Sequence, residues 1–143
     1  MIIYNVTESN ATTPEERWPE DQQLCLETFN KILNIHIVTG DIKKLFRLGK
    51  RDSQSDKGRP LLIQFRDRIL KNMIMESLSR LKDADEKFNK LIFAHDLTKN
   101  EREECKNLVA EAKVKELQDP SGEHIYRVRG APGSYRIVKI RKH

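Results

Sequence analysis

The sequence predicts an α+β protein: a ferredoxin-like β-α-β-β-α-β domain followed by a small C-terminal domain of one helix and a β-hairpin. Three observations lead to this prediction. Four short β-prone runs alternate with two amphipathic helical patterns between residues 1 and 95, a capped helical pattern begins near residue 98, and two basic β-prone runs flank a Pro-Gly turn near the C-terminus. With 143 residues, of which 37% are hydrophobic, the chain can bury a core without disulfides or metal.

The first forty residues predict a strand, an exposed loop and a helix. A short β-prone run over residues 2–6 ends at the turn-rich segment 8–14, which predicts a first strand followed by a loop. Beyond Pro19, apolar residues recur at helical spacing, and two acidic residues stand near the expected N-terminus, where the helix dipole favours carboxylates. We therefore predict a helix over about 19–33.

The middle of the chain predicts three strands and a second helix. A short apolar run preceded by turn signals is typical of a strand in a sheet interior, and an aspartate just before a helical pattern offers an N-cap. The polar segment between the second and third strands holds two glycines and no apolar residue. The elements predicted here are strands over 41–48, 61–65 and 91–93, a mobile loop over 49–59, and a helix from Asp67 to about Leu81.

The last part of the chain, residues 96–143, predicts a capped helix and a basic hairpin. Thr98 and Glu101 have the spacing of a capping box, in which each side chain satisfies a free backbone donor of the other residue. Turn residues at 119–122 end this helix, and a type II turn around Pro132-Gly133 joins the two strands. The sequence leaves open whether the two arginines of the first hairpin strand share a face with the basic residues of the second. The predicted strands cover 125–129 and 135–141.

The net charge of +5 is unevenly distributed. Segments 1–40 and 91–123 are acidic, with net charges of −4 and −3, whereas 41–90 and 124–143 each carry +6. Two basic regions separated by acidic ones indicate a positive face and a polyanionic partner. The alternative, that a lysine-rich protein simply solvates itself in this way, stays open on charge alone.

Catalytic chemistry has little support in the sequence. Cys25 and Cys105 lie far apart on the apolar stripes of two predicted helices, which favours buried structural thiols. The four histidines lack zinc-site spacing, and no glycine-rich phosphate loop occurs. We predict a non-catalytic protein without metal or cofactor. No apolar run is long enough for a membrane span and no signal peptide is evident, so we expect a soluble intracellular protein.

The basic residues are better organised than any catalytic candidates. Arginine and lysine at strand ends and in loops can neutralise phosphates without reading sequence. The hairpin, with six basic residues and no acidic one, is the main candidate contact element. Tyr4, Tyr126 and Tyr135 could stack on bases, although the last two could equally pack on the preceding helix. The predicted nucleic-acid-binding residues are Arg47, Lys50, Arg51, Lys57, Arg59, Arg66, Arg102, Lys106, Arg127, Arg129, Arg136, Lys139 and Arg141.

The predicted element order and the basic surface point to the RNA-recognition-motif fold, whose usual marks are aromatic residues on the first and third strands. Aligning the third-strand pattern through residues 63–65 puts Pro60 and Leu62 where the stacking aromatics should be. On the first strand, Ile2 takes the aromatic position. The stacking platform is therefore absent, and Tyr4 could be a single ring on the same open face.

That departure fits one family. The order IIYNVTES, a helix, FRLGKR, a polar loop, RPLLIQF, a helix, HDLTKNEREE and a basic hairpin resembles the first-open-reading-frame protein of LINE-type non-LTR retrotransposons. Those proteins join an atypical RNA-recognition motif to a small C-terminal domain. The resemblance covers nearly the whole chain and places the motif at 1–95 and the C-terminal domain at 96–143.

The resemblance implies binding of single-stranded RNA with little sequence preference, nucleic-acid chaperone activity, and packaging of the element's RNA into a ribonucleoprotein in the cytoplasm and also in the nucleus. The family's RNA-contacting residues carry over to Lys50 and Arg51, and to Lys106, where Cys105 interrupts a position that often holds paired arginines. Family members trimerise through an upstream coiled coil. No such heptad segment is present here, so we expect a fragment or a reduced version that is monomeric by itself.

Two main hypotheses follow. The first is a largely sequence-independent binder of single-stranded RNA that also tolerates single-stranded DNA. The second is a protein-interaction module, in which a platform carrying Ile2, Tyr4 and Leu62 takes a partner's apolar side chain. A small hydrolase is a third and weaker idea, because the sequence shows no organised nucleophile, base or metal set.

Overall fold

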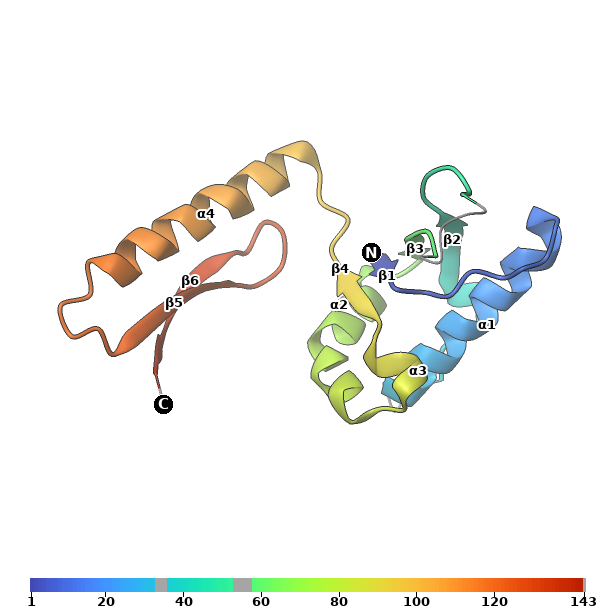
Figure 1. The fold of residues 1–143 in the computed structure, drawn as a ribbon, viewed down its shortest axis with the longest axis horizontal. Coiled ribbons are helices and arrows are strands. Elements are labelled where there is room, and N and C mark those ends of the chain that lie inside the picture. Colours follow the sequence, from blue (N-terminus) through green and yellow to red (C-terminus); the bar gives the residue numbers. More distant parts are fainter. Residues whose placement is uncertain (33–35, 53–57, 143) are drawn as a thin grey trace. The chain divides into compact units, whose positions relative to one another are not determined.

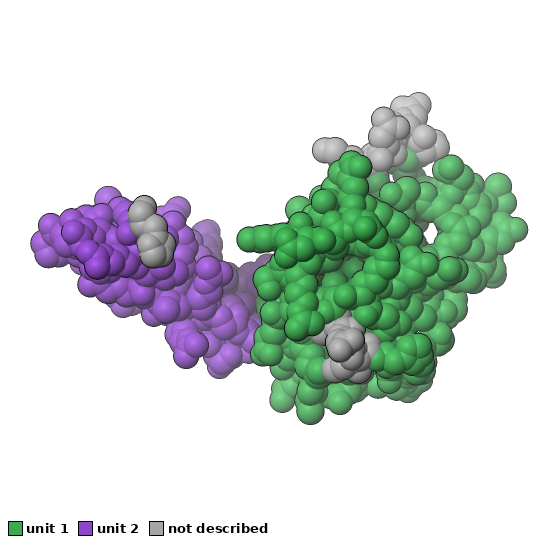
Figure 2. Space-filling model, turned by 90° about the horizontal axis from the view of Figure 1, so that it is seen from below, with its two compact units in different colours: residues 1–96 green, residues 97–143 purple. Residues whose placement is uncertain are grey.

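The computed structural model describes residues 1–32, 36–52 and 58–142. The chain divides into two compact units, residues 1–96 and residues 97–143, which Figure 2 colours separately. This division falls one residue from the boundary expected from the sequence. In the described part of the chain, no helix is both long enough and apolar enough to cross a membrane.

The first unit is built on a four-stranded antiparallel sheet (Figure 1). Its strands are β1 (Ile2–Tyr4), β2 (Ile42–Arg47), β3 (Leu61–Phe65) and β4 (Ile92–Ala94). They lie in the order β2-β3-β1-β4, so the first strand sits inside the sheet between β3 and β4. The four β-prone runs of the sequence therefore do form strands, with bounds within two residues of those predicted.

The first helix begins earlier than predicted. Helix α1 spans Pro14–Ile32, not about 19–33. Thr13 and Glu16 act as a capping box: the Glu16 N–H donates to Thr13 Oγ1 at 3.3 Å, and the Thr13 N–H donates to the Glu16 carboxylate at 3.4 Å. Pro14 fits the first helical position, where no intrahelical N–H is needed. Pro19, which suggested the helix start, lies inside α1 and costs it one backbone hydrogen bond.

The second helical region is divided into three pieces. Helix α2 spans Arg68–Ser77, and the Asp67 side chain accepts from the Ile69 N–H at 2.7 Å, which confirms the predicted N-cap. The predicted continuation to Leu81 is wrong, because the chain tightens into a 3₁₀ helix over Leu78–Asp83. A short helix that the sequence did not suggest, α3 (Glu86–Asn89), then leads into β4.

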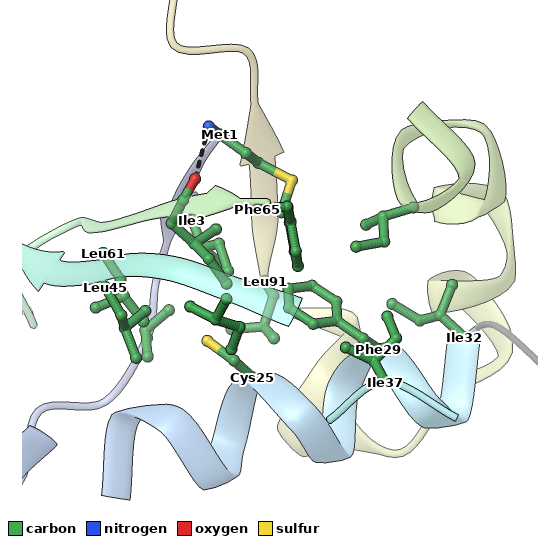
Figure 3. Close-up of a cluster of buried hydrophobic side chains, with 14 of the residues drawn as sticks. Met1, Ile3, Cys25, Phe29, Ile32, Ile37, Leu45, Leu61, Phe65 and Leu91 are labelled. Atoms are coloured by element: carbon green, nitrogen blue, oxygen red, sulfur yellow. Dashed lines mark hydrogen bonds between the residues drawn. The ribbon is translucent and has the colours of Figure 1, made fainter. Parts of the chain in front are cut away.

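The core of the first unit lies between one face of the sheet and the helices (Figure 3). Side chains alternate along β1 and β3, so Ile3 and Ile63 point into this core while their neighbours point to the opposite face. Helix α1 contributes Cys25 and Phe29, and the Phe29 ring meets the Phe65 ring edge-on at 5.4 Å between centroids. The opposite face of the sheet, called the open face below, carries Ile2, Tyr4 and Leu62.

The second unit consists of helix α4 (Lys99–Leu117) and a hairpin of β5 (His124–Arg129) and β6 (Arg136–Arg141). The predicted capping box is confirmed, since Thr98 Oγ1 accepts from the Glu101 N–H and the Glu101 carboxylate accepts from the Thr98 N–H. The predicted turn is also confirmed: the Ser134 N–H donates to the Ala131 carbonyl, and Gly133 has a φ of 80°. Strand β5 packs along α4.

The second unit has little core of its own. Among its described residues, Ala112 is the only one whose surface is buried. The apolar side chains of the hairpin are half-buried instead. A unit of this size buries a small fraction of its surface, so its own core contributes little stability.

Candidate nucleic-acid interface

Arg47 belongs to the interior of the first unit and not to a ligand surface. Its side chain is 6% exposed and forms an ion pair with Asp21, whose side chain is 9% exposed. All five of its N–H donors are used: two bind the Asp21 carboxylate, and three bind the carbonyl oxygens of Val6, Thr7 and Arg59 at 2.7 to 2.9 Å. No donor is left for a phosphate, so the assignment of Arg47 as a nucleic-acid contact is wrong.

Arg59 and Arg51 also hold the segment that joins β1 to α1. The Arg59 guanidinium forms a bidentate pair with Glu8, and this pair lowers the pKa of Glu8 and raises that of Arg59. Arg59 also donates to the Gly49 carbonyl at 2.9 Å. Arg51 donates to the carbonyls of Ser9 and Ala11. These two arginines therefore spend much of their hydrogen-bonding capacity within the fold.

The remaining basic residues of this region differ in how the structure places them. Lys50 is exposed beside Tyr4, in a shallow hollow of about 380 Å³ that Arg59 also lines. Arg66 is exposed at the end of β3 and donates from Nε to the Gly40 carbonyl at 2.6 Å. Lys57 lies outside the described residues.

The open face of the sheet carries two rows of apolar side chains beside the polar pair Lys44 and Gln64. The register aligns Phe46, Leu62, Ile2 and Ala94 in one row across the four strands, and Tyr4 lies opposite Ile92 in the next row. Phe46 is 48% exposed, Ile92 56% and Tyr4 39%. Tyr4 therefore does share the face of Ile2 and Leu62, and Phe46 is a second ring that the alignment to the third-strand pattern did not consider.

The basic residues of α4 lie on the surface of the second unit. Arg102 and Lys106 are exposed and stand one turn apart on the same side of the helix. Cys105, predicted to be buried, is only half-buried, on the side of α4 that faces the hairpin. It lies close to Tyr135, whose pKa is raised by burial and by the nearby Cys105 thiol. Tyr135 thus packs on the helix, which is the alternative to base stacking that the sequence left open.

The register of the hairpin answers the question left open by the sequence. Arg129 lies directly opposite Arg136, whereas Lys139 lies opposite Tyr126. Because opposite residues share a face and successive residues alternate, Arg127, Arg129 and Arg136 lie on one face and Lys139 and Arg141 on the other. Tyr126 is half-buried, with the Lys139 ammonium 5.9 Å from its ring centroid.

The hairpin cations differ in their acidic partners. Arg127 pairs with Glu116 of α4 at 3.1 Å, and Arg141 pairs with Glu123 at 3.5 Å. Arg129 and Arg136 are exposed, and no carboxylate of the described residues lies within ion-pair distance of either. Two like charges directly opposite each other destabilise a strand pair. Arg129 and Arg136 therefore form an exposed pair of like charges at the turn end of the hairpin.

A serine, a histidine and an aspartate meet in the turn before β5, a grouping that the sequence search for catalytic sets missed. Ser121 Oγ and Asp119 Oδ2 both lie against His124 Nδ1, at 3.2 and 3.0 Å. Ser121 also donates to the Asp119 carboxylate. A catalytic relay needs the hydroxyl and the carboxylate on opposite ring nitrogens, so this cluster orders the turn and activates no nucleophile. Within the described ranges, no group of three or more His, Cys, Asp or Glu is placed to hold a metal.

No protein-family model, no curated protein and no solved structure matches the chain.

Proposed function

We propose that this chain is a non-catalytic binder of single-stranded RNA, built from an atypical RNA-recognition motif and a C-terminal helix-hairpin domain. The fold part of the proposal is supported by the element order β1-α1-β2-β3-α2-β4 and by the strand order β2-β3-β1-β4, with α1 and α2 packed on one sheet face. The function part rests on the charge and exposure of the hairpin.

The observation that carries the functional proposal is the cross-strand pair Arg129 and Arg136. The register sets these two exposed guanidinium side chains directly opposite each other, and like charges in that position repel. A phosphodiester placed between them replaces this repulsion by two attractive, charge-assisted contacts. The pair therefore weakens the free hairpin slightly and strengthens its complex with a polyanion.

The exposed arrangement of these contacts favours single strands without sequence preference. Guanidinium contacts to phosphates position a strand but carry no base information. Weak, salt-dependent contacts of this kind suit a chaperone that must release and rebind RNA. We extend the proposal to the role implied by the family resemblance: packaging the RNA of a LINE-type element into a ribonucleoprotein.

The test is a salt titration of the full chain with single-stranded RNA, single-stranded DNA and duplex RNA. If about five phosphates are neutralised, log K falls with log salt with a slope near −3.5. The double variant Arg129→Gln with Arg136→Gln should remove one of these phosphate contacts, which brings the slope to about −2.8 and weakens binding roughly fourfold at 0.15 M salt.

The matched control is Lys82→Gln with Lys90→Gln, which should leave the slope unchanged. It removes one exposed charge from the 3₁₀ helix and another, paired with Glu86, just after α3. Wild-type binding that does not respond to salt would refute the proposal. So would equal losses in the arginine variant and the control, because binding would then follow net charge and not this hairpin.

A second candidate function is protein interaction through the open sheet face. It is favoured by the exposure of Phe46 and Ile92 in an apolar surface that crosses all four strands. In a competition assay with one labelled oligonucleotide, this function predicts that Phe46→Ser leaves RNA affinity unchanged while capture of an apolar peptide is lost. A loss of RNA affinity in Phe46→Ser would instead assign the ring to base stacking.

A further inference from the structure

A cavity of about 500 Å³ lies at the end of β3, where the strand turns into α2. Its wall is formed by the β3–α2 junction, by the first residue of the chain and by Asp96 at the end of the unit. The cavity opens beside Gln64, an exposed residue on the sheet face that carries Leu62. It is thus continuous with the open sheet face and large enough for one nucleotide unit.

Three cationic side chains line this cavity: Arg66, Arg68 and Lys71. Arg66 and Arg68 are exposed, and Lys71 is half-buried. Although nine ion pairs are formed elsewhere among the described residues, none of them involves these three side chains. Arg66 spends one donor on the Gly40 carbonyl, and a guanidinium has five.

Two carboxylates, those of Asp67 and Asp96, also face the cavity, and each interacts with another group. The Asp67 carboxylate caps α2 by accepting from the Ile69 N–H at 2.7 Å. Asp96 acts on the Met1 ammonium, which donates to the Ile63 carbonyl at 3.0 Å. Burial lowers the pKa of this ammonium, Asp96 opposes the shift, and Lys71 adds to it, so the positive field of Lys71 reaches into the cavity. The side chains around the cavity carry three positive and two negative charges, with the positive ones unpaired.

We infer that this cavity is a phosphate subsite for one phosphodiester of a single strand lying on the first unit. The inference rests on the proposed function and adds Lys71 and the Gln64 carboxamide to a strand end where the sequence had already predicted Arg66 as a contact. Arginine presents a planar fork that matches two phosphate oxygens, and lysine adds a point charge. The Gln64 carboxamide, a donor and an acceptor, stands next to the subsite for the edge of the attached base.

The test uses the full chain and an eight-nucleotide oligouridylate with a 5′ phosphate. In nuclear magnetic resonance titrations, the oligonucleotide should shift the backbone amides of residues 68–71. Inorganic phosphate should shift the same amides only at much higher concentration, which separates a phosphodiester from the free ion. If octaglutamate shifts these amides and the oligonucleotide does not, the cavity takes an acidic protein and the inference is wrong.

The matching variants remove the charge and then restore it. Arg68→Gln with Lys71→Gln should remove this one phosphate contact, which reduces the salt slope by about 0.7 and weakens binding roughly fourfold at 0.15 M salt. Arg68→Lys with Lys71→Arg should recover most of this loss, and Lys82→Gln with Lys90→Gln should not move the slope. A slope equal to wild type in the cavity variant overturns the inference. If the hairpin variant has meanwhile lost affinity, the proposed function still stands.

Discussion

Replacing Arg47 by methionine is the sharpest test of how the first unit is held together. The substitution keeps an unbranched side chain of similar length but leaves the Asp21 carboxylate and three backbone carbonyls without their donor. Breaking a buried ion pair from one side costs about 3–5 kcal/mol. This is a large share of the roughly 5–15 kcal/mol that stabilises a typical domain. With a urea m-value near 1.5 kcal/mol/M, the midpoint of unfolding should fall by about 2–3 M.

Urea unfolding followed by circular dichroism measures this change. Arg66→Met is the matched control, because Arg66 is exposed and makes one carbonyl contact, so its midpoint should move by less than about 0.5 M. Asp21→Leu combined with Arg47→Met should recover part of the loss, since no unpaired buried charge remains. The reasoning is refuted if Arg47→Met leaves the midpoint unchanged and lowers the salt slope of RNA binding, because Arg47 would then be a ligand contact.

Three further predictions concern thiol reactivity, pH and close packing in the first unit. Burial raises the pKa of the Cys25 thiol to about 12, so a thiol reagent at pH 8 should label Cys105 in the folded chain and reach Cys25 only in denaturant. The pairing with Arg59 lowers the pKa of Glu8. The pair therefore stabilises the fold at pH values above the ordinary glutamate pKa of 4.5, and this stabilisation is lost as the pH falls through the lower pKa of the folded state. When stability is measured against pH in acid, the Glu8→Gln variant should lack this loss. Gly58→Ala should lower the unfolding midpoint by an amount corresponding to about 1–3 kcal/mol, because the added methyl would collide with a backbone carbonyl of the β1–α1 segment; an unchanged melting curve would contradict this packing.

The basic loop of the first unit shows why counting cations overestimates a binding surface. From the sequence alone, Lys50 is as good a candidate for a phosphate contact as Arg47, Arg51 or Arg59. The structure uses these three arginines to fix the β1–α1 segment, through the Asp21 and Glu8 carboxylates and a set of backbone carbonyls. A sequence does not show which backbone carbonyls will need a donor. It therefore cannot distinguish a guanidinium that binds such carbonyls from one that is free to bind phosphate.

The open sheet face shows the opposite case, in which local pattern and tertiary structure agree. Alternation along β1 and β3 predicted that Ile2, Tyr4 and Leu62 would share a face, and the register confirms it. Phe46 joins them only through the pairing of β2 with β3, which places it opposite Leu62. The predicted strand over 41–48 gave no basis for predicting this register from the sequence.

The sequence by itself determined the strands and the main helices, the strand bounds to within two residues, the helix starts at the Asp67 N-cap and the Thr98 capping box, and the concentration of positive charge near the C-terminus. These depend on short-range physics: side-chain periodicity, turn residues and local capping. Only the tertiary structure decided which charges remain available, because ion pairing and cross-strand register join residues that are distant in the chain. Asp21 forms an ion pair with Arg47, which lies 26 positions away in the chain. The hairpin register sets Arg129 directly opposite Arg136, and we propose that both bind an anionic partner.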